Sequence, residues 1–253
     1  MRDFSELVAR WIKADWPAKP HIKAWVSTRA GDWNKPPYDG FNTADHVGDS
    51  LQAVQCSRSA VQYYFNLPQQ PIWLNQVHSN RVVEAVAENR AKDADASWTR
   101  RQGMACVIHT ADCLPVFFCN RSGSQVALAH AGWRGLLNGV LENTLATFSC
   151  AMSDVLVWFG PAIGPQVYEV GENVRQAFVQ RDSSAVAAFT SSDRPGHWYC
   201  DLYQLARQRL RRAGVTAMSG GDLCTFQDPR FFSYRRQNTT GRVLSLLWID
   251  ADQ

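Results

Sequence analysis

The sequence predicts an α+β fold made of one domain. Segments with the apolar periodicity of strands and of helices are interspersed along all 253 residues, but they do not alternate as regular βαβ units, as a doubly wound parallel sheet requires. No repeat, low-complexity tract or linker composition divides the chain, and its Pro and Gly residues are dispersed as turn residues. The glycine patterns of dinucleotide-binding and P-loop folds do not occur. We therefore expect a single domain over residues 1–253.

The first third of the chain combines helical and extended patterns. We expect, in order, a helix over 4–14, a strand over 22–28, a loop over 30–48, a helix over 51–65 and two short strands within 72–86. The second helix has apolar residues at three- and four-residue spacings and ends before Pro68. The two short strands are expected to meet at a turn near Ser79 and Asn80.

The middle of the chain contains its most apolar runs. These predict strands over 105–110, 114–119 and 125–131, followed by a helix over 136–148. The letters NRSGS between the second and third strands are typical of a turn, so these two strands should form a hairpin.

The last third returns to alternating helices and strands. We expect a strand from 155 that runs into a Gly-Pro turn before 164, helices over 171–180 and 202–214, and strands over 231–236 and 242–249. Asp201 stands where an N-cap should precede the second of these helices, and Gly214 suits its left-handed C-cap.

Charge and cysteine content exclude several classes of protein. A formal charge of +3 with scattered Lys and Arg does not indicate nucleic-acid binding, and the arginines within 207–212 are typical of a solvated helix face. No secretory signal or membrane-spanning run is visible, so we expect a cytoplasmic protein. Seven cysteines, with no C-x-x-C pair, indicate reduced thiols that are free to act as nucleophiles or metal ligands.

The predicted hairpin carries a possible metal site. If Cys119 pairs with a residue near Gln125, Cys113 lies opposite Ala131 with His130 one position away, and a bulge or twist can bring the two side chains together. His78, at a strand end beside a turn, is the leading third ligand. A His, Cys and His set suits zinc with one coordination position left open, and it also accepts copper.

Each of these three residues also has a purely structural interpretation. His78 can be a turn histidine, Cys113 a small buried side chain and His130 a strand-end residue with a hydrogen-bond partner, and their separations of 35 and 17 residues match no generic zinc motif. The other histidines are weaker candidates. His109 is expected inside a strand, and loops are expected to hold His21, His46 and His197.

Several strings carry a resemblance to a known family. They are NQVHSNRVV, HTADCLPVFFCN, AHAGWRGL, GPAIGPQVYEV, and FFSYRR with the closing TGRVLSLLWI. Over nearly its whole length the chain resembles the bacterial YfiH family, also called the laccase-domain or polyphenol oxidase family. The resemblance implies a single-domain layered sandwich of mixed β-sheets flanked by helices, with a zinc site at His78, Cys113 and His130.

The resemblance also implies an activity. Descriptions of the family include a copper-dependent polyphenol oxidase and, by comparison of its Cys and His, a cysteine hydrolase. More recent ones assign phosphorolysis of adenosine, inosine and methylthioadenosine, with deamination of adenosine. We expect this zinc-dependent nucleoside chemistry, with His78, Cys113 and His130 catalytic, and with a purine nucleoside and phosphate as the small-molecule partners. The sequence does not predict an oligomeric state.

Both reactions need further side chains. Deamination requires a proton carrier, for which Asp112 is the nearest candidate, although it equally suits a turn. Phosphorolysis requires an anion pocket, for which we consider Arg29 and Arg134, the second next to Trp133 on which it can instead stack. Asn42 is a candidate hydrogen-bond partner of base or sugar, or a residue that stabilises its own loop.

Three rival functions remain open. A multicopper laccase needs about ten histidines, whereas this chain has six and no H-x-H pair, so at most a single copper would support slow oxidation of phenols. A metal-free cysteine hydrolase would use Cys113 as nucleophile and His130 as base. The third is a binding module that senses a nucleoside or a cell-wall precursor without turnover.

Overall fold

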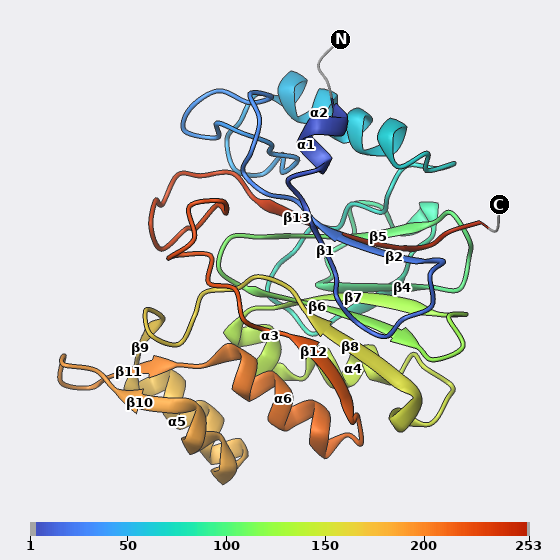
Figure 1. The fold of residues 1–253 in the computed structure, drawn as a ribbon. Helices are drawn as coiled ribbons and strands as arrows, with labels where there is room; N and C mark the ends of the chain where they lie inside the picture. Colours follow the sequence, from blue (N-terminus) through green and yellow to red (C-terminus); the bar gives the residue numbers. More distant parts are fainter. Residues whose placement is uncertain (1–3, 252–253) are drawn as a thin grey trace.

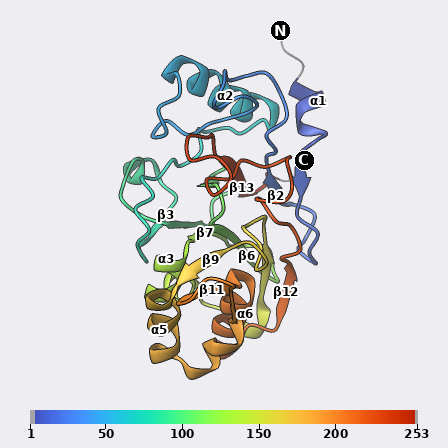
Figure 2. The same cartoon turned by 90° about the vertical axis from the view of Figure 1, so that its left-hand side faces the viewer.

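Two β-sheets pack face to face in the centre of the structure, and helices cover both outer surfaces (Figures 1 and 2). The computed structural model describes residues 4–251. In chain order the helices are α1 Phe4–Val8, α2 Leu51–Tyr64, α3 Trp133–Asn138, α4 Val140–Leu145, α5 Glu172–Arg181 and α6 Leu202–Arg212, with short 3-10 helices at Ala87–Asn89, Met152–Asp154 and Ser183–Ala188. Among these described residues no helix is long and apolar enough to span a membrane.

The strands form three sheets. Their bounds are β1 Ile12–Lys13, β2 Ile22–Val26, β3 Val82–Glu84, β4 Ala96–Thr99, β5 Ala105–Thr110, β6 Leu114–Asn120, β7 Val126–Ala131, β8 Val155–Phe159, β9 Glu169–Gly171, β10 Phe189–Ser191, β11 His197–Cys200, β12 Ala217–Gly220 and β13 Val243–Ile249. A six-stranded sheet has the order β12-β8-β6-β7-β4-β3, a four-stranded sheet the order β1-β2-β13-β5, and a small sheet the order β10-β11-β9. Parallel and antiparallel pairs both occur, which confirms an α+β fold with mixed sheets.

Three apolar layers hold these elements together. Between the two large sheets, side chains from both interdigitate, among them Ile108, Phe117 and Leu128. The outer face of the six-stranded sheet packs on α3 to α6, and that of the four-stranded sheet packs on the α2 side of the molecule. Strands buried on both faces need continuous apolar sequence, and this explains the long apolar runs in β5, β6 and β7.

Left-handed glycines divide one predicted helix and follow the end of another. The helix expected over 136–148 begins earlier, at Trp133, and it is divided into α3 and α4 by Gly139, whose φ of 95° lies in the left-handed region. The predicted caps of α6 are confirmed in part: the Asp201 side chain accepts a hydrogen bond from the Gln204 N–H, and Gly214 just after the helix has a φ of 95°.

Sheet pairing overrides some local patterns. The helix expected over 4–14 ends at Val8, because Ile12 and Lys13 pair with β2 as an edge strand. Residues 72–77 make only isolated bridges, so one of the two short strands expected within 72–86 is missing and only β3 forms. His197 lies in strand β11 rather than in a loop.

The segment 231–236 is the clearest wrong strand prediction. Phe231 and Phe232 are fully buried, but the backbone forms turns instead of pairing with a sheet. The Arg236 guanidinium donates to the carbonyls of Thr225 and Phe226, both at 2.8 Å, so its side chain holds the turn in place of a strand ladder. Strand β12, which no prediction included, forms the parallel edge beside β8.

Candidate metal centre

Three predicted ligands converge at one end of the six-stranded sheet. The donor atoms of His78, Cys113 and His130 all lie within 4.8 Å of one another. The His78 side chain is exposed, Cys113 is half-buried and His130 is buried, so the group is open to solvent on one side. The distance between Cys113 Sγ and His78 Nε2 is 3.9 Å, and the His78 and His130 rings meet edge to face at 4.8 Å.

The register of the β6–β7 hairpin brings Cys113 and His130 to the same face. Leu114 pairs with Ala131, one position away from the pairing we expected, so Cys113 continues opposite Gly132 instead of Ala131. In an antiparallel pair, opposite residues share a face and residues two positions apart share it too. Cys113 and His130 are therefore diagonal neighbours on one face, and no bulge is needed.

Gly132 leaves the space that the ligands occupy. A Cβ atom at this position would lie 2.9 Å from Cys113 Sγ and 3.0 Å from His78 Cδ2. Its backbone is extended, with φ of −65° and ψ of 162°, so the need for glycine here is steric and not conformational. A side chain at residue 132 would fill the point where sulfur and imidazole approach each other.

Asp95, a residue that our sequence analysis did not consider, fixes both histidines. Its Oδ1 lies 2.8 Å from His130 Nδ1 and accepts the His78 backbone N–H at 3.0 Å. Its Oδ2 accepts from the backbone N–H and the hydroxyl of Ser79 at 2.5 and 2.6 Å. His78 itself has a φ of 58°, and these hydrogen bonds to the surrounding backbone hold that left-handed turn.

The Asp95 contact also selects the tautomer of His130. An ionised carboxylate only accepts, so Nδ1 carries a proton, and Nε2 is the ring nitrogen left for a metal ion. Carboxylate, histidine and metal are commonly arranged in this order. Asp95 directly precedes β4, which pairs with the strand that carries His130. Our sequence analysis predicted no strand there, so nothing in it pointed to Asp95.

Charges in the cluster stabilise one another. Burial opposes ionisation of Cys113, but His130 and His78 outweigh it and lower the pKa of the thiol to about 6. Burial likewise disfavours the imidazolium of His130, yet Cys113 and Asp95 raise its pKa to about 9. Burial raises the pKa of Asp95 and its hydrogen bonds with His130 and Ser79 lower it, with a net lowering. A metal ion would take the place of the proton on His130, so that its donors become a thiolate and two imidazole nitrogens.

This donor set fits a single metal ion. Two imidazole nitrogens and one thiolate suit zinc with a fourth position open to a small molecule, and they are compatible with copper. Within residues 4–251, no second group of three His, Cys, Asp or Glu side chains converges in this way. The part of the chain that the structure describes therefore offers ligands for one such centre.

The predicted substrate-binding residues are not all free. The Arg29 guanidinium donates to both carboxylate oxygens of Asp39 at 2.7 Å and lines a separate hollow of about 700 Å³, which none of the three candidate ligands lines. Asn42 is fully buried: its amide donates to the Ala44 carbonyl and to Asp49, and its Oδ1 accepts from two backbone N–H groups. Arg134 is exposed and stacks on the Trp133 ring at 4.4 Å, as its alternative interpretation expected.

Asp112 has a structural role. Its φ of 93° places it in the left-handed region of the turn between β5 and β6. One carboxylate oxygen accepts from the Thr225 hydroxyl and the other from the Arg235 backbone N–H, both at 2.7 Å. Because both oxygens are engaged, the observed contacts favour the turn interpretation over proton transfer.

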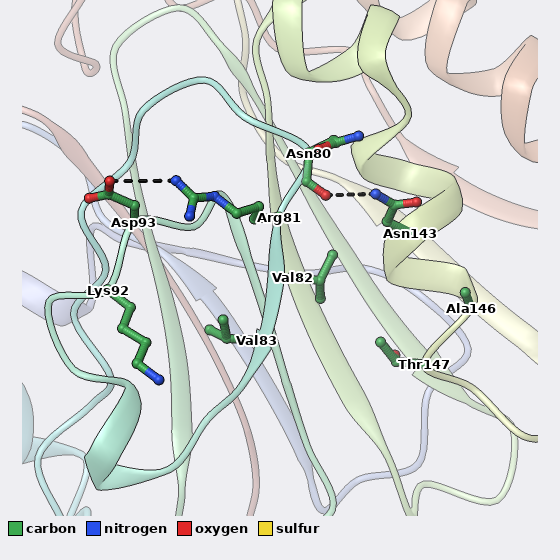
Figure 3. A pocket seen from close by; sticks show the side chains of 9 residues that line it. All are labelled: Asn80, Arg81, Val82, Val83, Lys92, Asp93, Asn143, Ala146 and Thr147. Carbon is green, nitrogen blue, oxygen red and sulfur yellow. Dashed lines mark hydrogen bonds and ion pairs between the residues drawn. The ribbon is translucent and has the colours of Figure 1, made fainter.

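A second hollow of about 640 Å³ lies beside the centre, between β3 and α4 (Figure 3). Arg81 on its wall reaches Asp93 at 3.5 Å, and the Asn80 carbonyl accepts from Asn143. None of its lining residues is a histidine or cysteine, and its carboxylate is already paired. The hollow therefore carries no catalytic group comparable to those of the metal centre.

Known proteins resemble this chain over nearly its whole length. The sequence model of the family described as multi-copper polyphenol oxidoreductase laccase matches residues 23–250. A protein of Pseudomonas aeruginosa named purine nucleoside phosphorylase is 49% identical over 94% of this chain and 98% of its own length. Purine nucleoside phosphorylase YfiH of Escherichia coli is 46% identical over 96% of this chain and 100% of its own length.

Solved structures show the same fold. The crystal structure of a Neisseria meningitidis protein superposes with a TM-score of 0.91, at 44% identity, over 95% of this chain and 99% of that one. YlmD from Geobacillus stearothermophilus gives a TM-score of 0.84 at 28% identity, over 95% and 96% of the two chains. With matching motifs, fold and near-complete coverage, this chain belongs to the YfiH family of laccase-domain proteins.

Proposed function

We propose that this protein is a zinc-dependent purine nucleoside enzyme, which cleaves adenosine, inosine and methylthioadenosine with phosphate and also deaminates adenosine. The observation that carries the proposal is the convergence of His78, Cys113 and His130 in a chain whose full-length relatives are named purine nucleoside phosphorylases. No nucleic acid or membrane is part of the proposal. The absence of disulfides among the seven cysteines supports a cytoplasmic location.

Zinc is the metal that we assign to the centre. Copper binds more tightly to most nitrogen and sulfur sites, but zinc is redox-inert and matches a three-ligand catalytic centre. When bound, zinc supplies Lewis acidity and makes water a stronger nucleophile near neutral pH. The residues His78, Cys113 and His130 would hold it, and Asp95 would keep the His130 ring in the orientation that ligation requires.

Phosphorolysis requires two substrates to be held side by side. A phosphate oxygen bonds to the ribose carbon that carries the base, and the bond from that carbon to the purine nitrogen breaks. The purine leaves with the bonding electrons and takes the proton given up by the phosphate, so that free base and ribose phosphate are the products. Much of the catalysis is then orientation, together with stabilisation of the negative charge that gathers on the leaving base.

Deamination would use the same metal centre, with water in place of phosphate. Water adds to the purine carbon that bears the amino group. One of its protons goes to that group, which leaves as ammonia with the bonding electrons, and the other ends on the adjacent ring nitrogen of inosine. The exposed His78 side leaves room for the base, whereas buried His130 and Asp95 keep the opposite side fixed. Cys113, which is half-buried, lies between the exposed and the buried histidine in accessibility.

Of the predicted substrate-binding residues, Arg134 supports the proposal most directly. It follows Gly132 by two positions, and in the described structure its guanidinium has no hydrogen-bond or ion-pair partner. Stacking on Trp133 leaves its N–H groups free for a substrate. We propose that Arg29 and Asn42 act at a distance, by shaping the loop over 30–48 that they anchor.

The test is turnover measured together with metal content. Purified protein is incubated with adenosine or inosine, with and without phosphate, and the products are separated by chromatography. We expect adenine or hypoxanthine with ribose phosphate only when phosphate is present, and inosine from adenosine without it. Cys113→Ala should lose at least about tenfold in metal affinity and nearly all turnover.

Cys56→Ala is the matched control, since Cys56 is an exposed free thiol on α2. It should keep full zinc content and activity. Absence of every product from the wild-type protein would leave only a binding function, and copper as the sole copurifying metal would favour phenol oxidation instead.

A second candidate is a metal-free cysteine hydrolase. The observation that favours it is the contact between Cys113 and both histidines, which resembles a nucleophile with its base. Alkylation by iodoacetamide separates the two candidates. A zinc-bound Cys113 should react only after a chelator is added, whereas a free nucleophile should react equally in both conditions. Exposed Cys56 serves as the internal reference.

A further inference from the structure

Arg242 lies beside the metal centre, although it is far from the three ligands in sequence. Strand β13 pairs with β5 so that Val243 lies opposite Thr110 and Leu244 opposite His109. Extension of this register by one position places Arg242 opposite Ala111, two residues before Cys113. Because side chains alternate along a strand, Arg242 shares a face with Leu244 and its partner His109.

The charge of Arg242 has no carboxylate partner in the described part of the chain. Its Nη1 donates to the carbonyls of Thr240 and Gly241 at 2.8 and 3.1 Å, and these are the only acceptors that its guanidinium contacts there. Burial lowers its pKa, which Cys113 and Asp112 partly offset. Because the Arg242 side chain is half-buried and only its Nη1 is engaged, an anion can still reach the rest of the guanidinium and pair with its charge.

Arg29 is a guanidinium of the same protein whose charge is paired with a carboxylate, so it can be compared with Arg242. Its Nε donates to the Asp39 carbonyl at 3.2 Å and its Nη2 to both Asp39 carboxylate oxygens at 2.7 Å, so the outer fork is occupied. In Arg242 the corresponding Nε and Nη2 have no partner. These two N–H groups lie on one edge of the planar guanidinium, in the geometry that binds two oxygens of a phosphate.

Arg58 and His46 are neighbours of this group, but burial and the Arg242 charge lower the pKa of His46, so His46 contributes a ring N–H and not a charge. His46 has a half-exposed side chain, and its ring lies 6.1 Å from that of buried His109. Arg58 stacks on Trp73 at 4.3 Å and donates to the Thr43 carbonyl at 2.8 Å. Asp45 is the carboxylate within ion-pair distance of this group, at 3.1 Å from Arg58 and 3.7 Å from His46, so it does not neutralise Arg242 as well.

We propose that Arg242, with His46 at the rim, binds the phosphate that attacks the nucleoside. The inference rests on the proposed function, because phosphate is the second substrate of that reaction. Two N–H groups of Arg242 hold two phosphate oxygens, and the position beside Cys113 keeps the anion next to a nucleoside bound at the metal centre. The guanidinium thereby supplies the anion pocket that the engaged Arg29 does not.

The experiment measures binding of inorganic phosphate to the purified metal-loaded protein by calorimetry, without nucleoside. Arg242→Gln should raise the Kd for phosphate at least about tenfold, and His46→Gln about threefold. Arg121→Gln is the control, since Arg121 is an exposed residue at the turn of the β6–β7 hairpin, 3.7 Å from Asp154. The control should bind phosphate as the wild-type protein does.

Arg242→Lys addresses the risk that the glutamine variant unfolds, since lysine keeps the charge but loses the fork. It should fold, bind phosphate several-fold more weakly and raise the KM for phosphate more than the KM for inosine. The same titration with AMP separates free phosphate from the phosphate group of a nucleotide. AMP binding without inorganic phosphate binding would overturn the assignment.

Failure of this inference is distinct from failure of the proposed function. If the wild-type protein does not bind inorganic phosphate, or if the folded Arg242 variants and His46→Gln bind it as the wild type does, the phosphate site is overturned. If the wild-type protein binds phosphate and the variants lose it while no nucleoside is cleaved, the site stands and the proposed function fails.

Discussion

Two buried histidines on adjacent elements of this fold have opposite charge preferences. His130 is the last but one residue of β7, with Asp95 at 2.8 Å, and although burial opposes it, Cys113 and Asp95 raise the His130 pKa to about 9. His109 lies in β5 with the Thr43 hydroxyl at 2.8 Å. Burial, with Arg58 as the next largest cause, holds the His109 pKa well below its usual value.

The nearest charged group, and not the extent of burial, accounts for the opposite pKa shifts of the two histidines. Both side chains are almost fully buried, and both have one hydrogen-bond partner on the ring. The Asp95 carboxylate orients the His130 ring and favours a positive charge beside it, which also suits a bound metal ion. Burial and then the nearby Arg58 keep His109 neutral, which suits a packing role against the stacked Trp73 ring at 5.4 Å.

The largest expected effect comes from removing the carboxylate that distinguishes His130. Asp95→Asn keeps the shape but removes the charge, so metal affinity should fall about 10- to 100-fold. The metal-free protein should lose about 3 kcal/mol of unfolding free energy, because a buried charged network is broken. Competition with a chelator and urea unfolding measure the two. Asp93→Asn, at a half-exposed carboxylate in the same segment, should change neither; an equal loss there would contradict the comparison.

The next largest effect is expected at Gly132, which leaves space for the ligands that accompany His130. In Gly132→Ala the new Cβ should displace Cys113 or His78 and lower metal affinity about tenfold, at a cost of about 1–3 kcal/mol for overpacking. Gly171→Ala is matched in backbone, with φ of −77° and ψ of 163°, and its Cβ would meet only the end of the Asn173 side chain. Metal titration of both variants should therefore separate them, and equal affinities would rule out the steric role of Gly132.

A pH series tests the neutral state of His109. Below the ordinary histidine pKa of 6.5 the unfolded chain binds a proton that folded His109 does not, so this residue reduces stability as the pH falls and contributes nothing above that range. In His109→Gln that loss should disappear. Relative to this variant, the wild-type unfolding free energy should fall by up to about 1.4 kcal/mol per pH unit between pH 6.5 and 5. Parallel curves would show that His109 is protonated in the fold.

The smallest expected effect is at the His109 hydrogen bond. Thr43→Val removes the hydroxyl that contacts Nε2 and should cost about 1 kcal/mol of unfolding free energy. Metal content should not change, since this histidine is not a ligand. Denaturant unfolding with elemental analysis checks both, and a loss of metal would show that the two histidines are coupled more tightly than their different partners indicate.

Local patterns were sufficient for the centre of this fold but not for its edges. The strands β5 to β8 and β13 follow from apolar runs because both faces of each are buried, and that burial leaves a plain sequence signal. Short edge elements such as β1 and β12 depend on a partner strand that sequence does not reveal. In 231–236 buried aromatics imitate a strand, although side-chain hydrogen bonds from Arg236 hold a turn.

The ligands could be proposed from sequence, but not the groups that orient them. Motifs identified His78, Cys113 and His130, whereas the hairpin register was wrong by one residue and hid the reason why two of them share a face. Asp95 was missed because an aspartate before a strand has no distinctive spacing. Free and occupied guanidiniums such as Arg242 and Arg29 look alike in sequence, since counterions are assigned by tertiary contacts.

The Asp95 carboxylate connects three parts of the chain that must meet before the metal centre is complete. Asp95 accepts a hydrogen bond from the His78 backbone N–H and directly precedes β4. It also contacts His130 on β7, the strand with which β4 pairs. An intermediate that has closed only the β6–β7 hairpin holds two donors without the third, and it cannot retain an ion firmly. Uptake of metal during refolding therefore reports that the His78 turn, β4 and the β6–β7 hairpin have come together.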